Sequence, residues 1–133
     1  MQFWIDKEQE KRPDAEWQDA YVFSINREKY STIFTNIANS WYQMDQLQIP
    51  AIYEDLFIIG LSIFALDKRV SRRMFKDCWT REISVSIPVF EYDKWKCTEL
   101  QWENTLSFLT GDHWHITFRR SDVIYSYREH VKR

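Results

Sequence analysis

The chain has 133 residues, a length that suits one domain able to bury roughly two thirds of its unfolded surface. Hydrophobic residues make up 44% and aromatic residues 17%, against only two Gly and three Pro, which excludes a disordered, collagen-like or low-complexity chain. The formal net charge of −2 gives no global attraction to nucleic acid or to anionic lipid.

The cysteines and the apolar runs indicate the cellular compartment of the protein. Cys78 and Cys97 are the only cysteines, and no charged-then-apolar leader begins the chain, which predicts a reducing, cytoplasmic setting with two buried structural thiols. The apolar run at 56–66 is too short to span a bilayer. A membrane role therefore has no support in the sequence.

The first part of the chain predicts two strands and a helix. Residues 3–5 are a short aromatic and apolar strand, followed by a charged stretch that contains Pro13. Residues 21–25 alternate between the two faces of a second strand. Asn26 is a candidate cap for an amphipathic helix over 26–46.

The stretch 50–89 carries the strongest pattern in the sequence. Pro50 suits a first helical turn, and the apolar spacing predicts a helix from there to about Arg73 that is buried nearly all round in its middle. Its main stripe is Ile52, Leu56, Ile59, Ile63, Leu66 and Val70. Alternation over 83–89 then predicts a strand with one face in the core.

The remaining residues predict a connection, a helix and a strand. After a connection at 90–96, Thr98 and Gln101 have the form of a capping box, with Asp93 as an earlier alternative. A helix of about twelve residues then ends at Gly111 in the left-handed conformation. A strand over 113–119 and a final strand or tail at 123–127 complete a single α+β domain, with three or four helices on a small, mostly antiparallel sheet.

Two histidines form the only pattern in the sequence that resembles part of a metal-binding site. His113 and His115 lie two apart on a predicted strand and share a face, but no companion spacing supplies further ligands. Cys78, Cys97 and Asp112 are only candidates for that role, so a solvated face is favoured and no metal is assigned. A hydrolase built on these histidines and Asp112 is the weakest functional hypothesis.

A basic cluster follows the central helix. It contains six basic residues interleaved with Phe75 and Trp79, types that bind phosphates and stack on bases, although cations also favour the end of a helix. Asp67 should pair with Arg69, Arg73 or Arg81 at the corner between helix and strand. The basic residues are Lys68, Arg69, Arg72, Arg73, Lys76 and Arg81.

Sequence motifs of the common catalytic centres are absent. The chain contains no Walker A, dinucleotide-binding, nucleophile-elbow, HExxH or CxxC motif, and no SGG-type pyrophosphate loop. We therefore expect no enzymatic activity and no cofactor.

Several short pieces together resemble a known family. They are the apolar helix ending at Asp67 with Arg69 and Arg73, then DCWTR at 77–81, IPV at 87–89, Trp95, and LSFLTGDHW at 106–114. This pattern resembles the N-terminal region of long-form 7-cyano-7-deazaguanine-synthase-like proteins of bacterial anti-phage defence operons. The likeness covers residues 53–120, about half of the chain, and its most specific piece is 106–114.

The resemblance implies an accessory domain of a defence complex. The family's pyrophosphate-loop ATPase domain carries an SGGLDS motif, which these 133 residues lack, so its adenylating activity does not carry over. What is implied is a non-catalytic module that docks such an enzyme or its protein substrate. Independently of the resemblance, the large number of aromatic residues makes Trp4, Trp17 and Trp41 candidate anchors of an interface, the alternative being that they fill the core. The possible partner-binding residues are Asp67, Arg69, Arg73, Trp79, Arg81, Gly111, Asp112 and Trp114.

The alternative is a nucleic-acid-binding module. It would use the basic cluster at 68–81, with Lys68, Arg72 and Lys76 as contacts to the nucleic acid, together with a basic tail. The tail residues are Arg128, Lys132 and Arg133.

Overall fold

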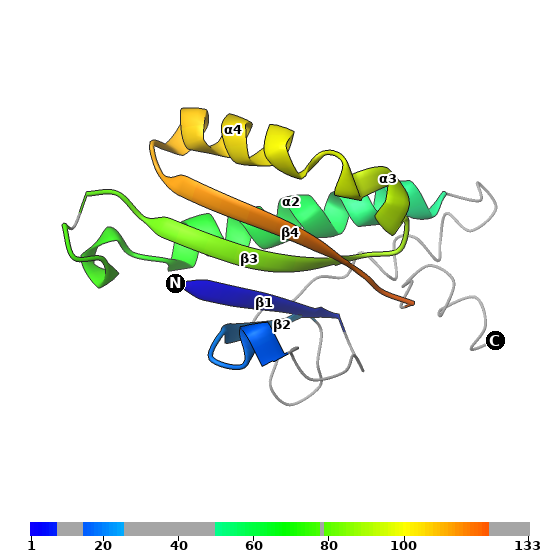
Figure 1. The fold of residues 1–133 in the computed structure, drawn as a ribbon, viewed down its shortest axis with the longest axis horizontal. Helices are drawn as coiled ribbons and strands as arrows, with labels where there is room; N and C mark the ends of the chain where they lie inside the picture. The colour runs from blue at the N-terminus through cyan, green and yellow to red at the C-terminus, as the bar shows by residue number, and fades with distance from the viewer. Residues whose placement is uncertain (8–14, 26–49, 78, 123–133) are drawn as a thin grey trace.

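The computed structural model describes residues 1–7, 15–25, 50–77 and 79–122 (Figure 1). The helix expected at 26–46, the last strand at 123–127, and Trp41, Cys78 and the basic tail lie outside the described residues. The described elements are β1 (Gln2–Lys7), η1 (Ala15–Trp17), β2 (Tyr21–Ile25), α2 (Ala51–Arg69), η3 (Arg72–Met74), β3 (Glu82–Val89), α3 (Tyr92–Lys96), α4 (Glu99–Thr110) and β4 (His113–Arg120).

The four strands form one parallel sheet in the order β2-β1-β3-β4. The fold is therefore α/β, and the prediction of a mostly antiparallel sheet was wrong. Each connection between strands is long enough to return the chain to the same end of the sheet, which parallel pairing requires. The scarcity of glycine already argued against tight hairpins, and a parallel sheet needs none.

One face of the sheet forms the main core with α2 and α4. The register places Phe3 beside Val85 and Val85 beside Ile116, so these side chains project from the same face. Buried residues of both helices join them in one hydrophobic cluster. In Figure 1, α2 passes behind β3 and β4, and α4 runs alongside β4. The residues predicted to face the core are buried in both strands: Ile83, Val85, Ile87 and Val89 of β3 and Trp114, Ile116 and Phe118 of β4. In β4 they alternate with exposed or half-buried residues, whereas Ser86 and Pro88 of β3 are also buried, so the one-sided burial predicted for β3 is wrong in its second half.

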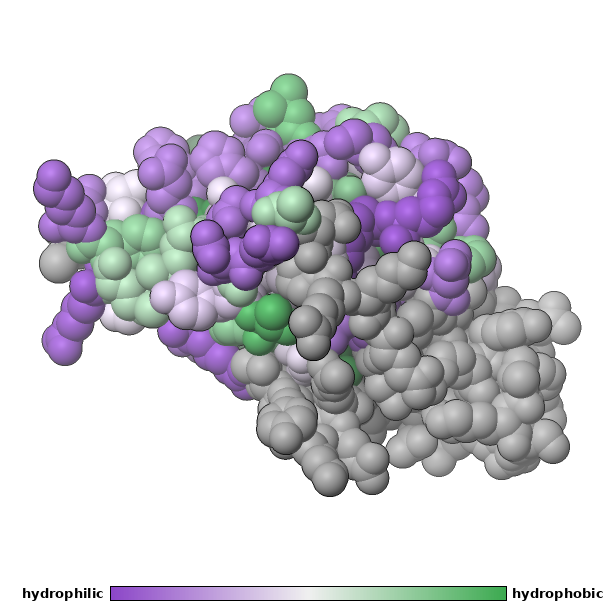
Figure 2. Space-filling view, turned by 60° about the horizontal axis from the view of Figure 1, so that its bottom comes forward, coloured by the Kyte–Doolittle hydropathy of each residue, from purple (hydrophilic) through white to green (hydrophobic). Residues whose placement is uncertain are grey.

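The opposite face of the sheet is more polar and only partly covered. Trp4 lies there against Trp17 of η1, with ring centroids 6.3 Å apart, and the Arg119 guanidinium stacks 3.7 Å from the Trp4 ring. Both tryptophans are buried, which favours the alternative that they fill the core and not that they anchor an interface. Figure 2 brings the β2 side forward and shows mostly hydrophilic or neutral side chains on its described part.

Helix α2 differs from its prediction in length and in burial. It ends at Arg69, not Arg73, because Val70 is extended and the Ser71 hydroxyl accepts a hydrogen bond from the Arg73 N–H to begin η3. Its buried face includes Glu54, Asp55 and Ser62, whereas two large residues that were expected to be buried, Leu56 and Phe64, are exposed.

The prediction for the segment before β4 was correct at the end of the segment and wrong at its start. The connection at 90–96 contains the short helix α3. The Thr98 hydroxyl donates to the Trp95 carbonyl at 2.6 Å, so Thr98 and Gln101 form no capping box, and Asp93 lies inside α3. Gly111 has φ 75°, which confirms the left-handed end of α4.

Candidate functional site

The side chain of Asp112 lies at the centre of an ion cluster at the amino ends of β3 and β4. One oxygen, Oδ1, accepts hydrogen bonds from the Arg81 N–H at 2.8 Å and from Arg72 Nη1 at 2.5 Å. The other, Oδ2, accepts from Arg81 Nε at 2.9 Å, from Arg81 Nη2 at 2.7 Å and from Arg72 Nη2 at 3.2 Å. We call Asp67, Arg72, Arg81 and Asp112 the Asp112 cluster.

Arg81 connects this cluster to the end of α2. Its Nη2 lies 2.6 Å from Asp67 Oδ1, and its Nη1 donates to the carbonyls of Val70 at 2.8 Å and Asp67 at 3.1 Å. Asp67 therefore pairs with Arg81, one of the three partners expected. The carboxylate of Asp67 is nevertheless 47% exposed, so it is less buried than its helix predicted.

The turn after α4 positions Asp112. Gly111 turns the chain in the left-handed conformation, and the Thr110 hydroxyl accepts hydrogen bonds from the Asp112 N–H at 3.2 Å and from Trp114 Nε1 at 3.0 Å. Four residues of the motif at 106–114 therefore act together, which their spacing alone did not indicate.

The arginines decide the charge state of Asp112. Burial by itself raises the pKa of this carboxyl, but the hydrogen bonds and positive charge of Arg81 and Arg72 outweigh it and lower the pKa to about 2. Asp112 is therefore ionised at neutral pH with both oxygens occupied. The cluster holds the end of α2, the start of β3 and the start of β4 in fixed relation, which makes its members positioning residues.

The loop between η3 and β3 is anchored at both ends by this cluster. Arg72 Nη1 donates to the Trp79 carbonyl at 2.6 Å, and Asp77 Oδ1 accepts from the N–H groups of Trp79 at 2.9 Å and Thr80 at 3.1 Å. These two N–H groups lower the pKa of Asp77. The Trp79 side chain is 79% exposed although its backbone is held on both sides.

The basic cluster is divided between internal and external roles. Arg72 and Arg81 bind Asp112, Lys68 lies over the Phe64 ring at 5.7 Å, and Arg69 lies over the Phe23 ring at 5.7 Å. Arg73 and Lys76 are exposed. Within the described residues, at least two of the six cations, Arg72 and Arg81, form internal ion pairs, which leaves fewer cations for a phosphate backbone.

The two histidines of β4 do not join the Asp112 cluster. His113 and His115 are exposed on the strand face opposite Trp114, and His115 Nε2 lies 3.7 Å from Glu82 Oε1. Within residues 1–7, 15–25, 50–77 and 79–122, no group of three or more potential metal ligands is found. Cys97, expected to be buried, is exposed, and its thiol donates to the Lys94 carbonyl at 3.4 Å.

A second group of charges, which the sequence pattern did not indicate, lies at the carboxyl ends of β1 and β3. Lys7 Nζ and Glu54 Oε2 are 3.0 Å apart, with both side chains almost fully buried. Asp55 accepts hydrogen bonds from the N–H groups of Phe90 and Glu91, each at 2.8 Å, and from Trp95 Nε1 at 3.1 Å. Carboxylates in a first helical turn are common, so their spacing carried no signal of burial.

The environment of Asp55 changes its acidity. Burial raises the pKa of Asp55, and this effect exceeds the opposing influence of the two backbone N–H groups, Lys7 and Trp95. Ligands of parallel α/β sheets commonly bind outside the carboxyl ends of the strands, which is where this group lies. Its hydrogen bonds also join α2 to the β3–α3 turn, a structural role.

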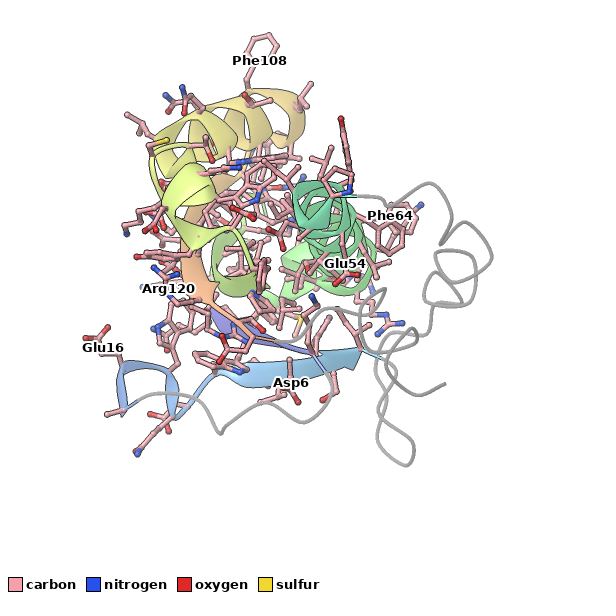
Figure 3. All side chains as sticks on the ribbon, turned by 90° about the vertical axis from the view of Figure 1, so that its right-hand side faces the viewer. Asp6, Glu16, Glu54, Phe64, Phe108 and Arg120 are labelled. Carbon is pink, nitrogen blue, oxygen red and sulfur yellow. The ribbon has the colours of Figure 1, made fainter. Side chains whose placement is uncertain are left out.

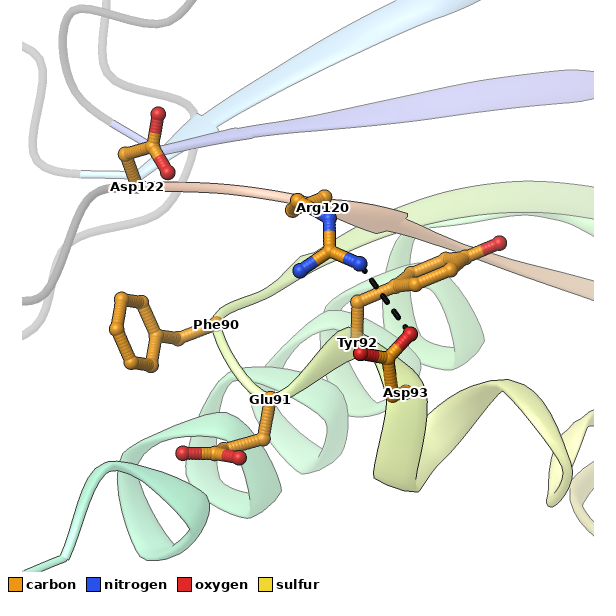
Figure 4. A pocket seen from close by; sticks show the side chains of 6 residues that line it. All are labelled: Phe90, Glu91, Tyr92, Asp93, Arg120 and Asp122. Carbon is orange, nitrogen blue, oxygen red and sulfur yellow. Dashed lines mark hydrogen bonds and ion pairs between the residues drawn. The ribbon is translucent and has the colours of Figure 1, made fainter.

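A groove of about 310 Å³ opens beside this group, at the carboxyl ends of β3 and β4 (Figure 4). Arg120 crosses it, with its guanidinium 5.1 Å from the centre of the Tyr92 ring and Nη2 3.2 Å from Asp93 Oδ1. The other lining residues are Phe90, Glu91 and Asp122. The groove thus combines three carboxylates, one arginine and two aromatic rings.

The outward face of α4 carries large apolar side chains. Phe108 is 88% exposed, Leu109 69% and Leu100 66%. Figure 3 shows Phe108 pointing away from the body of the protein. The other exposed residues on α4 are Gln101, Asn104 and Thr105, so this face carries no charge. Of the residues of α4, only Leu106 is buried.

Comparisons with known proteins give no match. No protein-family model, no curated protein and no solved structure is significantly similar to the chain. In the part of the chain that the structure describes, no helix is long and apolar enough to cross a membrane.

Proposed function

We propose that this chain is a non-catalytic protein-interaction subunit or accessory domain of a bacterial anti-phage defence complex, which docks a deazaguanine-synthase-like enzyme or its protein substrate. The observation that carries the proposal is the uncharged outward face of α4, where Phe108 and Leu109 are largely exposed. Large apolar side chains that adjoin one another on a surface are typical of interaction sites.

The position of these two residues supports the proposed partner. Phe108 and Leu109 belong to the segment 106–114, on which the resemblance to the deazaguanine-synthase-like proteins mainly depends. Folding does not require them to be apolar, because neither is buried. Contact with a partner explains an apolar pair at this place.

Co-expression tests this proposal. The tagged chain is co-expressed with the products of its flanking genes, purified, and the complex is analysed by mass spectrometry and light scattering. We expect a stoichiometric complex with a pyrophosphate-loop enzyme. Phe108→Glu should weaken that complex by at least about tenfold, the scale of a central apolar anchor, because it places a charge in an apolar contact.

Phe64→Glu is the matched control, because Phe64 is also an exposed phenylalanine and projects from α2 (Figure 3). It should leave the complex intact, and both variants should unfold at the temperature of the unsubstituted protein. Purification of the chain without any partner would contradict the docking function. A complex weakened by Phe64→Glu and not by Phe108→Glu would place the contact on α2.

A further inference from the structure

The outward face of α4 has a regular arrangement of side chains that docking of an enzyme does not by itself explain. Its exposed residues form two adjacent rows in which successive residues are four positions apart, the ridge pattern through which two helices commonly pack. The first row is Leu100, Asn104 and Phe108, and the second row is Gln101, Thr105 and Leu109. The larger side chains therefore lie toward both ends of the helix, and the small polar ones lie at its middle.

The two rows are related by a local two-fold symmetry. A half-turn about an axis that passes between Asn104 and Thr105 reverses the direction of the helix and exchanges the positions of Leu100 and Leu109. In an antiparallel pair of α4 helices with this axis, Leu100 of each copy lies opposite Leu109 of the other. Apolar side chains thus meet at both ends of such a pair.

The absence of charge on this face suits a second copy of the chain in particular. A two-fold interface brings the same surface patch of both copies together, so a charge near the axis lies close to its own like charge. None of the exposed residues of α4 is charged. Its two acidic residues, Glu99 and Glu103, are half-buried in the same helical stripe as the buried Leu106, and Glu99 bonds to β4. Like charges on α4 therefore do not oppose pairing through this face.

The middle of the face allows two helices to approach closely. Asn104 and Thr105 are short, and both side chains can donate and accept hydrogen bonds, so the Asn104 amide of one copy can bond to the Thr105 hydroxyl of the other. Uncharged polar side chains at the centre of a helix pair fix its register and orientation. The antiparallel direction also places the positive end of each helix dipole beside the negative end of the other.

We propose that a second copy of this chain covers the outward face of α4, in an antiparallel two-fold pair, when the enzyme is absent, and that docking of the enzyme displaces this copy. The inference rests on the function proposed above, because both occupants use the same face. A helix of twelve residues is about 18 Å long and about 10 Å wide, so its face buries much less than the roughly 800 Å² per partner of a standard interface. We therefore expect a weak, reversible dimer, which an enzyme that contacts further surface displaces.

Sedimentation equilibrium of the purified chain without enzyme tests the pairing. We expect the average mass to rise from one chain toward two over an about hundredfold increase in protein concentration. Asn104→Asp should weaken this association by at least about tenfold, because the two introduced carboxylates flank the axis and repel each other. Phe64→Glu, which changes an exposed phenylalanine of α2, should alter the association by less than about twofold.

A mixture of two variants distinguishes a second copy from any other occupant of the face. Asn104→Asp and Asn104→Lys should each be largely monomeric alone, whereas an equimolar mixture should form a dimer with one copy of each, because opposite charges then flank the axis. High salt should reduce both the repulsion and the rescue. Both variants should unfold at the temperature of the unsubstituted protein, because Asn104 is exposed.

Addition of the pyrophosphate-loop enzyme recovered by co-expression tests the displacement. We expect the dimer to dissociate and each enzyme subunit to bind one copy of the chain. Three results would overturn the inference: a chain that stays monomeric at every concentration, a dimer that Asn104→Asp does not weaken, and an enzyme complex that retains the dimer. A monomeric chain that still binds the enzyme would leave the docking function intact, whereas a dimer that binds no enzyme would support the pairing and contradict the docking function.

Discussion

Asp112 is the residue on which the amino end of the sheet depends most. Replacing it with Asn removes the charge that Arg72 and Arg81 face and leaves the largely buried guanidinium of Arg81 with weaker acceptors. We expect Asp112→Asn to lower the free energy of unfolding by about 3 kcal/mol, the scale for breaking a buried ion pair. Urea denaturation measures this change, and Asp122→Asn, an exposed carboxylate, should shift it by less than about 0.5 kcal/mol.

The same carboxylate gives the protein a defined sensitivity to acid. The pKa of Asp112 is about 2 in the folded protein and near 3.8 when unfolded, so the unfolded chain binds the proton first. Its stabilising contribution is complete above about pH 4 and is lost as the pH falls toward 2. Denaturation midpoints across this range should fall less steeply in Asp112→Asn than in the unsubstituted protein, and equal slopes would contradict the assignment.

Individual residues of the cluster were only partly predictable. Asp67 next to a basic loop indicated an ion pair, and Arg81 forms it. The burial of Asp112 and the pairing of Lys7 with Glu54 depend on contacts between residues 31 to 47 positions apart, which local spacing does not encode. Long-range pairs of this kind follow from the order and direction of strands, and the strand direction expected from the sequence was wrong.

At the scale of the elements, the two glycines have opposite expected responses to alanine. Gly60 lies in the interior of α2 with nothing within 4 Å of the place where a Cβ would lie, so Gly60→Ala should raise the free energy of unfolding by about 0.5–1 kcal/mol. Gly111 has φ 75°, so Gly111→Ala should lower it by about 1 kcal/mol although space is equally free there. Thermal denaturation of the pair measures both, and a stabilising Gly111→Ala would contradict the helix end.

Element types were easier to predict than their burial. The changes of hydrophobic period correctly located four strands, and Gly111 correctly ended α4. The stripe expected on α2 is confirmed at Ile59, Leu66 and Val70 and wrong at Leu56, which is exposed. The expectation that the middle of the helix is buried nearly all round was wrong, because apolar residues at helical spacing show only that a face can be buried: Phe64 is exposed, whereas Asp55 and Ser62 are buried. When a helix such as α2 has apolar residues on most of its faces, the sequence does not indicate which face packs against the core.

For the molecule as a whole, the sheet order predicts a gradient of local stability. Strand β3 has β1 on one side and β4 on the other, with α2 and α4 packed on the sheet, whereas β2 has β1 as its one partner in the described sheet and exposes Tyr21 and Val22. Hydrogen exchange should therefore be at least about tenfold slower in β3 than in β2. Equal protection of β2 and β3 would show that the order of strands in the sheet does not control local unfolding.

The hydrogen bond between Glu99 and Phe118 has a consequence for association through β4. The N–H groups of His113 and Ser121 point toward β3, so the alternate N–H groups, including that of Phe118, point toward the outer side of the strand. Glu99 Oε2 accepts the Phe118 N–H at 2.8 Å. The Glu99 carboxylate thus occupies the place where a strand of another molecule would form hydrogen bonds with β4. This side chain therefore opposes edge-to-edge aggregation.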